Sequence, residues 1–212
     1  MEFQHVNVKL FVKKAEEVDL GALIPVFHEW IRNQSRGELL LDIADYRHVH
    51  SGPGIVLIGH EGNYSLDNSG GRLGVRYNRK ALLEGSNQDR LAQATQAALA
   101  ACLRLKAEPS LGRGIPFNGR EMEVFINDRL LAPNCAQTRK AAFSEFETFF
   151  SHLFGSCEFD LTYPTDPRIL FGVRATTFQS LATETLLENL RALAPVPSPG
   201  WGFSVVASAC RS

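Results

Sequence analysis

Hydrophobic and polar residues alternate near the start of the chain, in the segment HVNVKLFVK at 5–13. A period of two is typical of a strand with one face in the core. Apolar residues then recur at helical spacing after Asp19, at Leu20, Leu23, Ile24, Phe27, Trp30 and Ile31. This pattern predicts a helix with Asp19 as its N-cap. Because of Pro25, that helix must begin near Ile24 or kink there.

The segment from Leu39 to Lys80 holds three of the six histidines and most of the turn signals. It predicts a strand over 39–50, a Ser-Gly-Pro-Gly turn, a strand over 55–61 and a strand near 72–78. Pro109 ends the helical pattern that follows. The alanine-rich inner side of that helix consists of Leu91, Ala94, Ala98, Cys102 and Leu105.

The second half of the chain begins with a candidate hairpin turn at Asn118–Gly119, followed by a strand over 121–128. Strands over 157–163 and 169–175 and a helix over 181–193 are predicted further on. A helix between them carries the apolar stripe Phe143, Phe146, Phe150, Leu153 and Phe154. Helical periodicity favours core packing over a cofactor site for this stripe.

The two halves share one element order, namely strand, helix, strand, turn, strand and helix, with one added hairpin strand in the first half. This order predicts an α+β protein, a two-layer sandwich of antiparallel or mixed sheet with helices on one face. It also raises the hypothesis of a duplicated ferredoxin-like strand-helix-strand-strand-helix unit. Residues 1–110 and 111–194 are then two halves of one compact body, followed by a Pro-rich linker and tail at 195–212.

Composition narrows the classes of function. The chain has 212 residues, 44% of them hydrophobic, and a net charge of -1, which argues against disorder and against nucleic-acid binding. None of the four cysteines forms a CxxC pair. The N-terminus lacks a secretory pattern and no apolar run spans a bilayer, so we expect a cytoplasmic protein without a membrane partner.

His48 and His50 suggest a metal site, since imidazole binds transition metals and two residues in i, i+2 positions on a strand share a face. His60 does not join them in a plain hairpin. It would lie about four residues, or roughly 13 Å, along the strand from His48. A metal held by His48, His50 and a distant carboxylate such as Asp67 stays open, beside the simpler interpretation of polar residues near a turn.

His60 is instead a candidate general base, because a carboxylate that fixes its tautomer would make a His–Asp pair. A three-residue loop puts His60 opposite Ala44, with Asp42 as a diagonal neighbour, whereas a four-residue loop puts it opposite Asp45. Either pair is also compatible with a purely structural hydrogen bond across the sheet.

A small anionic ligand is suggested by the glycine-rich turn Asn68–Gly71 and the arginines after it. Arg72, Arg76, Tyr64 and Asp67 are the candidate binding residues. The segment lacks the spacing of a P-loop or a dinucleotide fingerprint, so a plain hairpin turn is the alternative.

Two functions follow from these patterns. In the first, the protein is a non-catalytic ligand-binding or assembly module, in which duplicated halves favour a homo-oligomer. In the second, it is an enzyme with a His/Asp general base or a metal-assisted hydrolytic site in the 39–80 region. The sequence does not predict a particular cofactor.

Overall fold

The computed structural model describes residues 1–33, 38–112 and 114–193, which form an eight-stranded antiparallel sheet with four α-helices. The strands are β1 (Val6–Val12), β2 (Leu40–Tyr46), β3 (Gly54–Gly59), β4 (Gly62–Asp67), β5 (Gly74–Arg79), β6 (Phe117–Ile126), β7 (Phe159–Thr162) and β8 (Phe171–Thr177). The helices are α1 (Leu23–Arg32), α2 (Asn87–Ala107), α3 (Ala136–Phe154) and α4 (Thr183–Leu193). The predicted α+β class is confirmed. The predicted tail at 195–212 lies outside the described residues.

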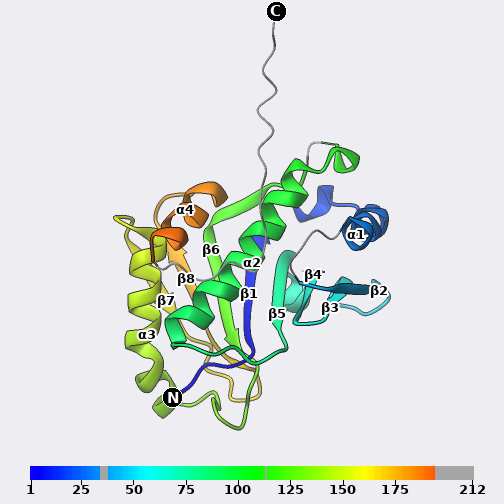
Figure 1. Cartoon of the computed structure of the whole chain (residues 1–212). Helices are drawn as coiled ribbons and strands as arrows, with labels where there is room; N and C mark the ends of the chain where they lie inside the picture. The colour runs from blue at the N-terminus through cyan, green and yellow to red at the C-terminus, as the bar shows by residue number, and fades with distance from the viewer. Residues whose placement is uncertain (34–37, 113, 194–212) are drawn as a thin grey trace, which may run out of the picture.

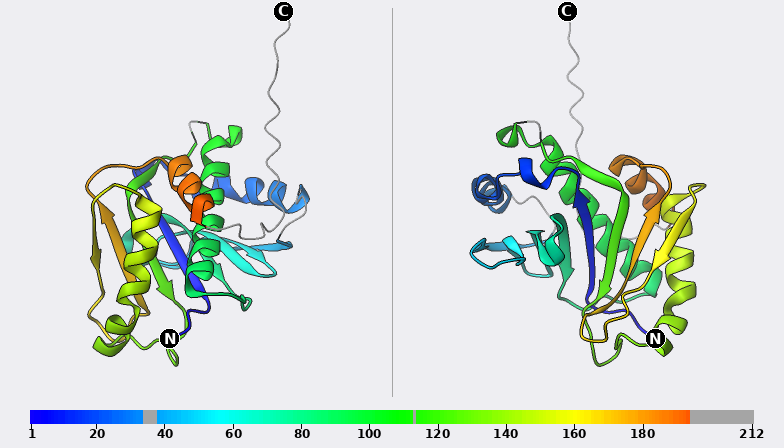
Figure 2. Two further views of the ribbon diagram at one scale, coloured as in Figure 1. Left: turned by 60° about the vertical axis from the view of Figure 1, so that its left-hand side comes forward. Right: turned by 180° about the vertical axis from the view of Figure 1, so that it is seen from behind.

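The strands follow the order β2-β3-β4-β5-β1-β6-β8-β7, so β1 lies in the interior of the sheet beside β5 and β6 (Figure 1). Helices α2, α3 and α4 gather on one face, and the view from behind shows strands rather than helices on the other (Figure 2). Helix α1 packs against β2 and β3 at the far end of the sheet. None of the helices in the described ranges is long and apolar enough to cross a membrane.

The alternation in β1 sets the two faces. Val8 pairs with Tyr77 on β5 and with Val124 on β6, and all three side chains are fully buried in the core beneath the helices. Lys9 and Asn7 point the other way because successive strand residues face opposite sides. The period of two therefore predicted the element and its inner face correctly.

Helix boundaries follow local capping. Ser86 and Asp89 form a capping box at the start of α2, in which the Ser86 backbone N–H donates to Asp89 Oδ2 at 2.7 Å. Asp19 caps a short 3₁₀ turn, Leu20–Ala22, and α1 begins after it at Leu23. Pro25 then falls in the first helical turn, where a missing N–H costs nothing.

The phenylalanine stripe of α3 belongs to the core, as predicted. Phe146, Phe150, Leu153 and Phe154 of the stripe are buried, and Phe143, at 47% exposed, is the member that turns away. Phe149, which the predicted stripe did not include, is also buried. The buried phenylalanines of α3 are therefore Phe146, Phe149, Phe150 and Phe154.

One predicted hairpin turn is wrong. Asn118–Gly119 lies inside β6 and forms no hairpin. A Cβ atom on Gly119 would stand 1.9 Å from the carbonyl oxygen of Leu181, whose N–H donates to Gly119 O at 3.0 Å. Glycine is therefore required here for close approach of two backbones, which a turn signal resembles in sequence.

The hairpin of β2 and β3 also differs from the prediction. Strand β2 ends at Tyr46, so residues 47–53 form a longer connection than the three or four residues expected. Strand β4 was not predicted. Its residues Asn63 to Leu66 mix Asn and Ser with Tyr and Leu and were given no element, yet pairing on both sides holds them in the sheet.

The two halves share a connection order in the sheet. In each half the first strand, β1 or β6, pairs with the last strand, β5 or β8, and the remaining strands extend outward. Strands β1 and β6 then pair antiparallel at the junction of the halves. Duplication of a ferredoxin-like unit stays a hypothesis. The shared strand order is compatible with it.

We expect Gly119→Ala to destabilise the protein by about 1–3 kcal/mol, since the new methyl group overlaps the Leu181 carbonyl and one backbone must move. Urea unfolding measures the loss. Asn118→Ala, one residue away, is the control and should cost much less. Equal losses in the two variants would show that the crossing of backbones at Gly119 is not constrained.

Candidate functional site

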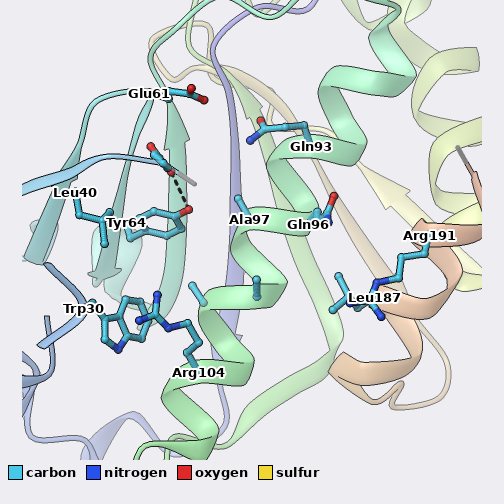
Figure 3. A pocket seen from close by; sticks show the side chains of 13 residues that line it. Trp30, Leu40, Glu61, Tyr64, Gln93, Gln96, Ala97, Arg104, Leu187 and Arg191 are labelled. Atoms are coloured by element: carbon cyan, nitrogen blue, oxygen red, sulfur yellow. Dashed lines mark hydrogen bonds between the residues drawn. The ribbon is translucent and has the colours of Figure 1, made fainter. Parts of the chain in front are cut away.

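A pocket lies between α1, α2, the second half of α4 and the strands β2 and β4 (Figure 3). It encloses about 50 Å³, which is space for roughly four water-sized groups. Small residues of α2 form much of one wall and leave this space open. The lining consists of Trp30, Glu38, Leu40, Glu61, Tyr64, Gln93, Gln96, Ala97, Ala100, Ala101, Arg104, Leu187 and Arg191.

Its inner end is a cluster of buried polar side chains. The Tyr64 hydroxyl donates to Glu38 Oε2 at 2.9 Å, and both residues are buried. The rings of Tyr64 and Tyr77, which are paired across β4 and β5, lie with centroids 4.9 Å apart. From α2, Gln93 donates its amide to the Tyr77 hydroxyl at 3.3 Å. Figure 3 shows Tyr64 and Gln93 reaching into the pocket from sheet and helix.

Burial controls the protonation of this cluster. Desolvation raises the pKa of Glu38, while the Tyr64 hydroxyl and the nearby Gly62 N–H oppose the rise. The pKa of Tyr64 is raised well above its ordinary value by burial and then by the Glu38 carboxylate. The same two causes raise the pKa of Tyr77 to about 12. Both hydroxyls thus keep their protons at neutral pH.

Two acceptors in the cluster lack a donor. Glu38 Oε1 and Gln93 Oε1 are buried, and neither makes a hydrogen bond of normal geometry with the described residues. An unsatisfied buried acceptor costs about 1–3 kcal/mol. The inner end of the pocket therefore favours a guest that brings hydrogen-bond donors.

The outer part is apolar and positively charged. The Arg104 guanidinium lies over the Trp30 ring, 3.7 Å from its centroid, as Figure 3 shows. Burial lowers the pKa of Arg104 to about 10, so it stays charged at neutral pH. Arg191 of α4 also lines this side, and Leu187 supplies apolar surface. Glu61, at the opposite end, is paired with Arg79 Nη1 at 2.6 Å.

The polar groups of the pocket are hydrogen-bonding groups. Within the described ranges no three His, Cys, Asp or Glu side chains are close enough to hold a metal ion. Two carboxylates line the pocket: Glu61 is paired with Arg79, and Glu38 accepts a hydrogen bond from the Tyr64 hydroxyl beside the Gln93–Tyr77 hydrogen bond. Such a set orients a small polar molecule by hydrogen bonds.

The predicted pairing of His60 with an aspartate is wrong. His60 follows β3 in the turn to β4, and its backbone N–H donates to Leu39 O at 2.7 Å. Asp42 pairs instead with Ile58, and Asp45 with Ile55. The longer 47–53 connection shifts the register and moves His60 beyond both aspartates. A general-base role for His60 stays a prediction from sequence, without the carboxylate on which it depended.

Asp45 has a structural partner close by. Its carboxylate binds the Arg47 guanidinium through Oδ2 at 2.6 Å, and this interaction lowers the Asp45 pKa to about 2. His48 and His50 lie in the same 47–53 connection rather than on β2, and both are exposed. The i, i+2 strand geometry proposed for them is therefore absent, because β2 ends two residues before His48.

The four residues predicted to bind an anion lie in two places. Tyr64 points into the pocket beneath the helices, whereas Asp67 and Arg76 lie on the opposite face of the sheet. Arg72 pairs with Glu121 on that face at 2.5 Å. Asp67 is buried and holds the Lys9 ammonium at 2.6 Å, and Arg76 Nη1 lies 3.7 Å from its second oxygen.

Sequence reasoning missed the residues of the pocket other than Tyr64. Trp30 and Gln93 are on helical patterns that were read as core, and Glu38 precedes β2 without any motif. One signal was present. Gln93 and Gln96 interrupt the alanine-rich inner side of α2, and a polar residue on a buried helix face needs a partner.

No family model matches the chain, and no curated protein matches its sequence. The site must therefore be interpreted from its own chemistry. Self-association and cytoplasmic location, expected from sequence, stay predictions.

We expect Glu38 to make stability fall as pH rises. The pKa of Glu38 is raised in the folded state, so the folded state binds the proton more tightly than the unfolded state does. The resulting gain in stability is fully present below the unfolded pKa. It is lost as the pH rises through the folded pKa. Each unit between the two values corresponds to about 1.4 kcal/mol. Urea unfolding between pH 4 and pH 8 should show this slope in the wild type and lose it in Glu38→Gln.

Glu188→Gln is the matched control, because Glu188 is an exposed carboxylate on α4. Its pH profile should follow the wild type. A Glu38→Gln profile that also follows the wild type would contradict the raised pKa.

The Lys9–Asp67 pair predicts a second stability effect. Both side chains are nearly inaccessible, so Asp67→Asn leaves a buried ammonium without its counter-charge and should cost about 3–5 kcal/mol. Lys9→Met combined with Asp67→Leu removes both charges and should cost less than the single change. Urea unfolding of the single and double variants tests this, and a double variant less stable than Asp67→Asn would contradict it.

Proposed function

We propose that the protein is a ligand-binding module that holds a small molecule rich in hydrogen-bond donors in the pocket beside Glu38. The observation that carries the proposal is the pair of buried acceptors, Glu38 Oε1 and Gln93 Oε1, that make no hydrogen bond of normal geometry with the described residues. A guest that donates to both would satisfy groups that are otherwise costly to bury.

The pocket also limits the guest in size and polarity. A volume of about 50 Å³ accepts a small group rather than a drug-sized molecule. Trp30, Leu40 and Leu187 offer apolar contact beside the polar end. The best fit is a compact, planar donor group, such as an amidine, a guanidine or a primary amide, at the inner end.

Charge at the two ends suggests an orientation. The Glu38 carboxyl lies at the inner end, while Arg104 and Arg191 line the outer part. A molecule that enters with its donor group first would keep any anionic part near the arginines. This is complementary electrostatics, which fixes orientation more than it adds affinity.

Trp30 provides a direct reporter. The chain has two tryptophans, so Trp201→Phe leaves Trp30 as the single one. We expect acetamidinium, which carries planar N–H donors, to change Trp30 fluorescence in a saturable way. Acetate has the same shape with acceptors in place of donors, and should give no saturable change.

Variants locate the binding. Glu38→Gln should weaken acetamidinium binding about 10-fold or more, because a charge-assisted hydrogen bond contributes about 1.5–3 kcal/mol. Glu188→Gln should bind as the parent does. Equal responses to acetate and acetamidinium, or binding unaffected by Glu38→Gln, would overturn the proposal.

A further inference from the structure

The helix-free face of the sheet carries a row of charged side chains in register. Lys9 on β1 pairs with Arg76 on β5 and with Glu123 on β6, and Glu123 pairs in turn with Arg174 on β8. The row crosses four neighbouring strands. It lies on the face opposite the pocket of Glu38 and contributes no residue to that pocket.

A groove of about 460 Å³ lies over this row. The turn with Ser69 and Gly70 bounds one side, and the segment between β7 and β8 bounds the other. This volume falls in the range of small-molecule sites, which is about 300–1,000 Å³. Its apolar surface comes from Phe125, Pro164, Ile169 and Leu170.

Gly172 keeps the floor of the groove open. A Cβ atom at this position would stand 2.4 Å from the Val124 carbonyl oxygen and 3.0 Å from Phe125 Cδ1. Without that atom, the Phe125 ring lies beside the neighbouring strand. The result is an aromatic surface next to the charged row.

Arg76 is a cation of the groove whose terminal nitrogens are spare donors. Its Nε donates to Asn78 Oδ1 at 2.8 Å, and its Nη1 is 3.7 Å from Asp67, beyond a hydrogen bond. Neither terminal nitrogen makes a hydrogen bond within the described part of the chain. The guanidinium also lies 5.4 Å from the centroid of the Phe125 ring.

The carboxylates nearby are already occupied. Asp67 Oδ1 accepts from Lys9 at 2.6 Å and Oδ2 from the Ser69 hydroxyl at 2.8 Å. Glu123 Oε1 accepts two hydrogen bonds from Arg174, at 2.8 and 2.5 Å. Three cations in the row, Lys9, Arg76 and Arg174, therefore face two carboxylates, which leaves one positive charge in excess.

We propose that this groove binds a small organic anion, with its carboxylate, sulfonate or phosphate group on Arg76 and its apolar body on Phe125, Ile169 and Leu170. The guanidinium fork matches such oxyanions in two-point geometry. The Lys9–Asp67 pair beneath holds the strand and the Ser69 turn, so the groove is formed before the anion arrives.

Two probes with nearly the same body separate charge from apolar contact. The dye 8-anilinonaphthalene-1-sulfonate carries an anionic group, and N-phenyl-1-naphthylamine lacks it. We expect Arg76→Gln to weaken binding of the sulfonate about 10-fold or more, with little effect on the neutral dye. Arg47→Gln, which removes an exposed cation paired with Asp45, is the matched control and should change neither affinity.

Further variants keep the test decisive. Phe125→Leu should weaken both dyes, and Arg76→Lys should give sulfonate binding between the wild type and Arg76→Gln, with folding checked by circular dichroism. Glu38→Gln should leave both dyes unaffected, which separates this groove from the pocket. Sulfonate binding that Arg76→Gln and Arg47→Gln reduce equally, or not at all, would overturn the proposal.

Discussion

Strand β1 is the constraint on which the rest of the molecule depends. All of its seven residues are buried, and it joins the halves of the chain by pairing with β5 on one side and β6 on the other. A strand in this position has no exposed edge, so its side chains on both faces need partners. The valines and Leu10 find them beneath the helices. Lys9 requires a counter-charge, which β4 supplies from two strands away as Asp67.

The same division of faces explains why two unlike sites coexist. Beneath the helices, α2 approaches the sheet through alanines and leaves a small pocket where Gln93 meets Tyr77 and where Glu38 meets Tyr64. On the other face no helix of the described residues covers the strands, so long charged side chains form the surface themselves. Desolvation dominates the first site and charge pairing the second.

Local patterns predicted most of the elements, although not strand β4, and few residues of the sites. The alternation in β1, the alanines of α2 and the phenylalanines of α3 each report which side of an element is buried, and the structure agrees with them. Gly119 and His60 show the limit. Gly119 meets Leu181, a contact that no neighbouring residue signals, and the partner of His60 depends on a connection length that the turn residues do not determine.

Strand β4 contributes residues to both the pocket and the charged row, and its register decides which residue goes to which. Tyr64 and Leu66 face the helices, and Ser65 and Asp67 face the open side, since successive residues alternate. A slip of one residue would send Asp67 into the core and Tyr64 away from Glu38. The sequence prediction placed Tyr64, Asp67 and Arg76 in one anion site because they are close in sequence. Without strand β4, the prediction could not show that Tyr64 faces the opposite side of the sheet. Once β4 is recognised, its alternation alone separates a hydroxyl for the pocket from a carboxylate for the charged row.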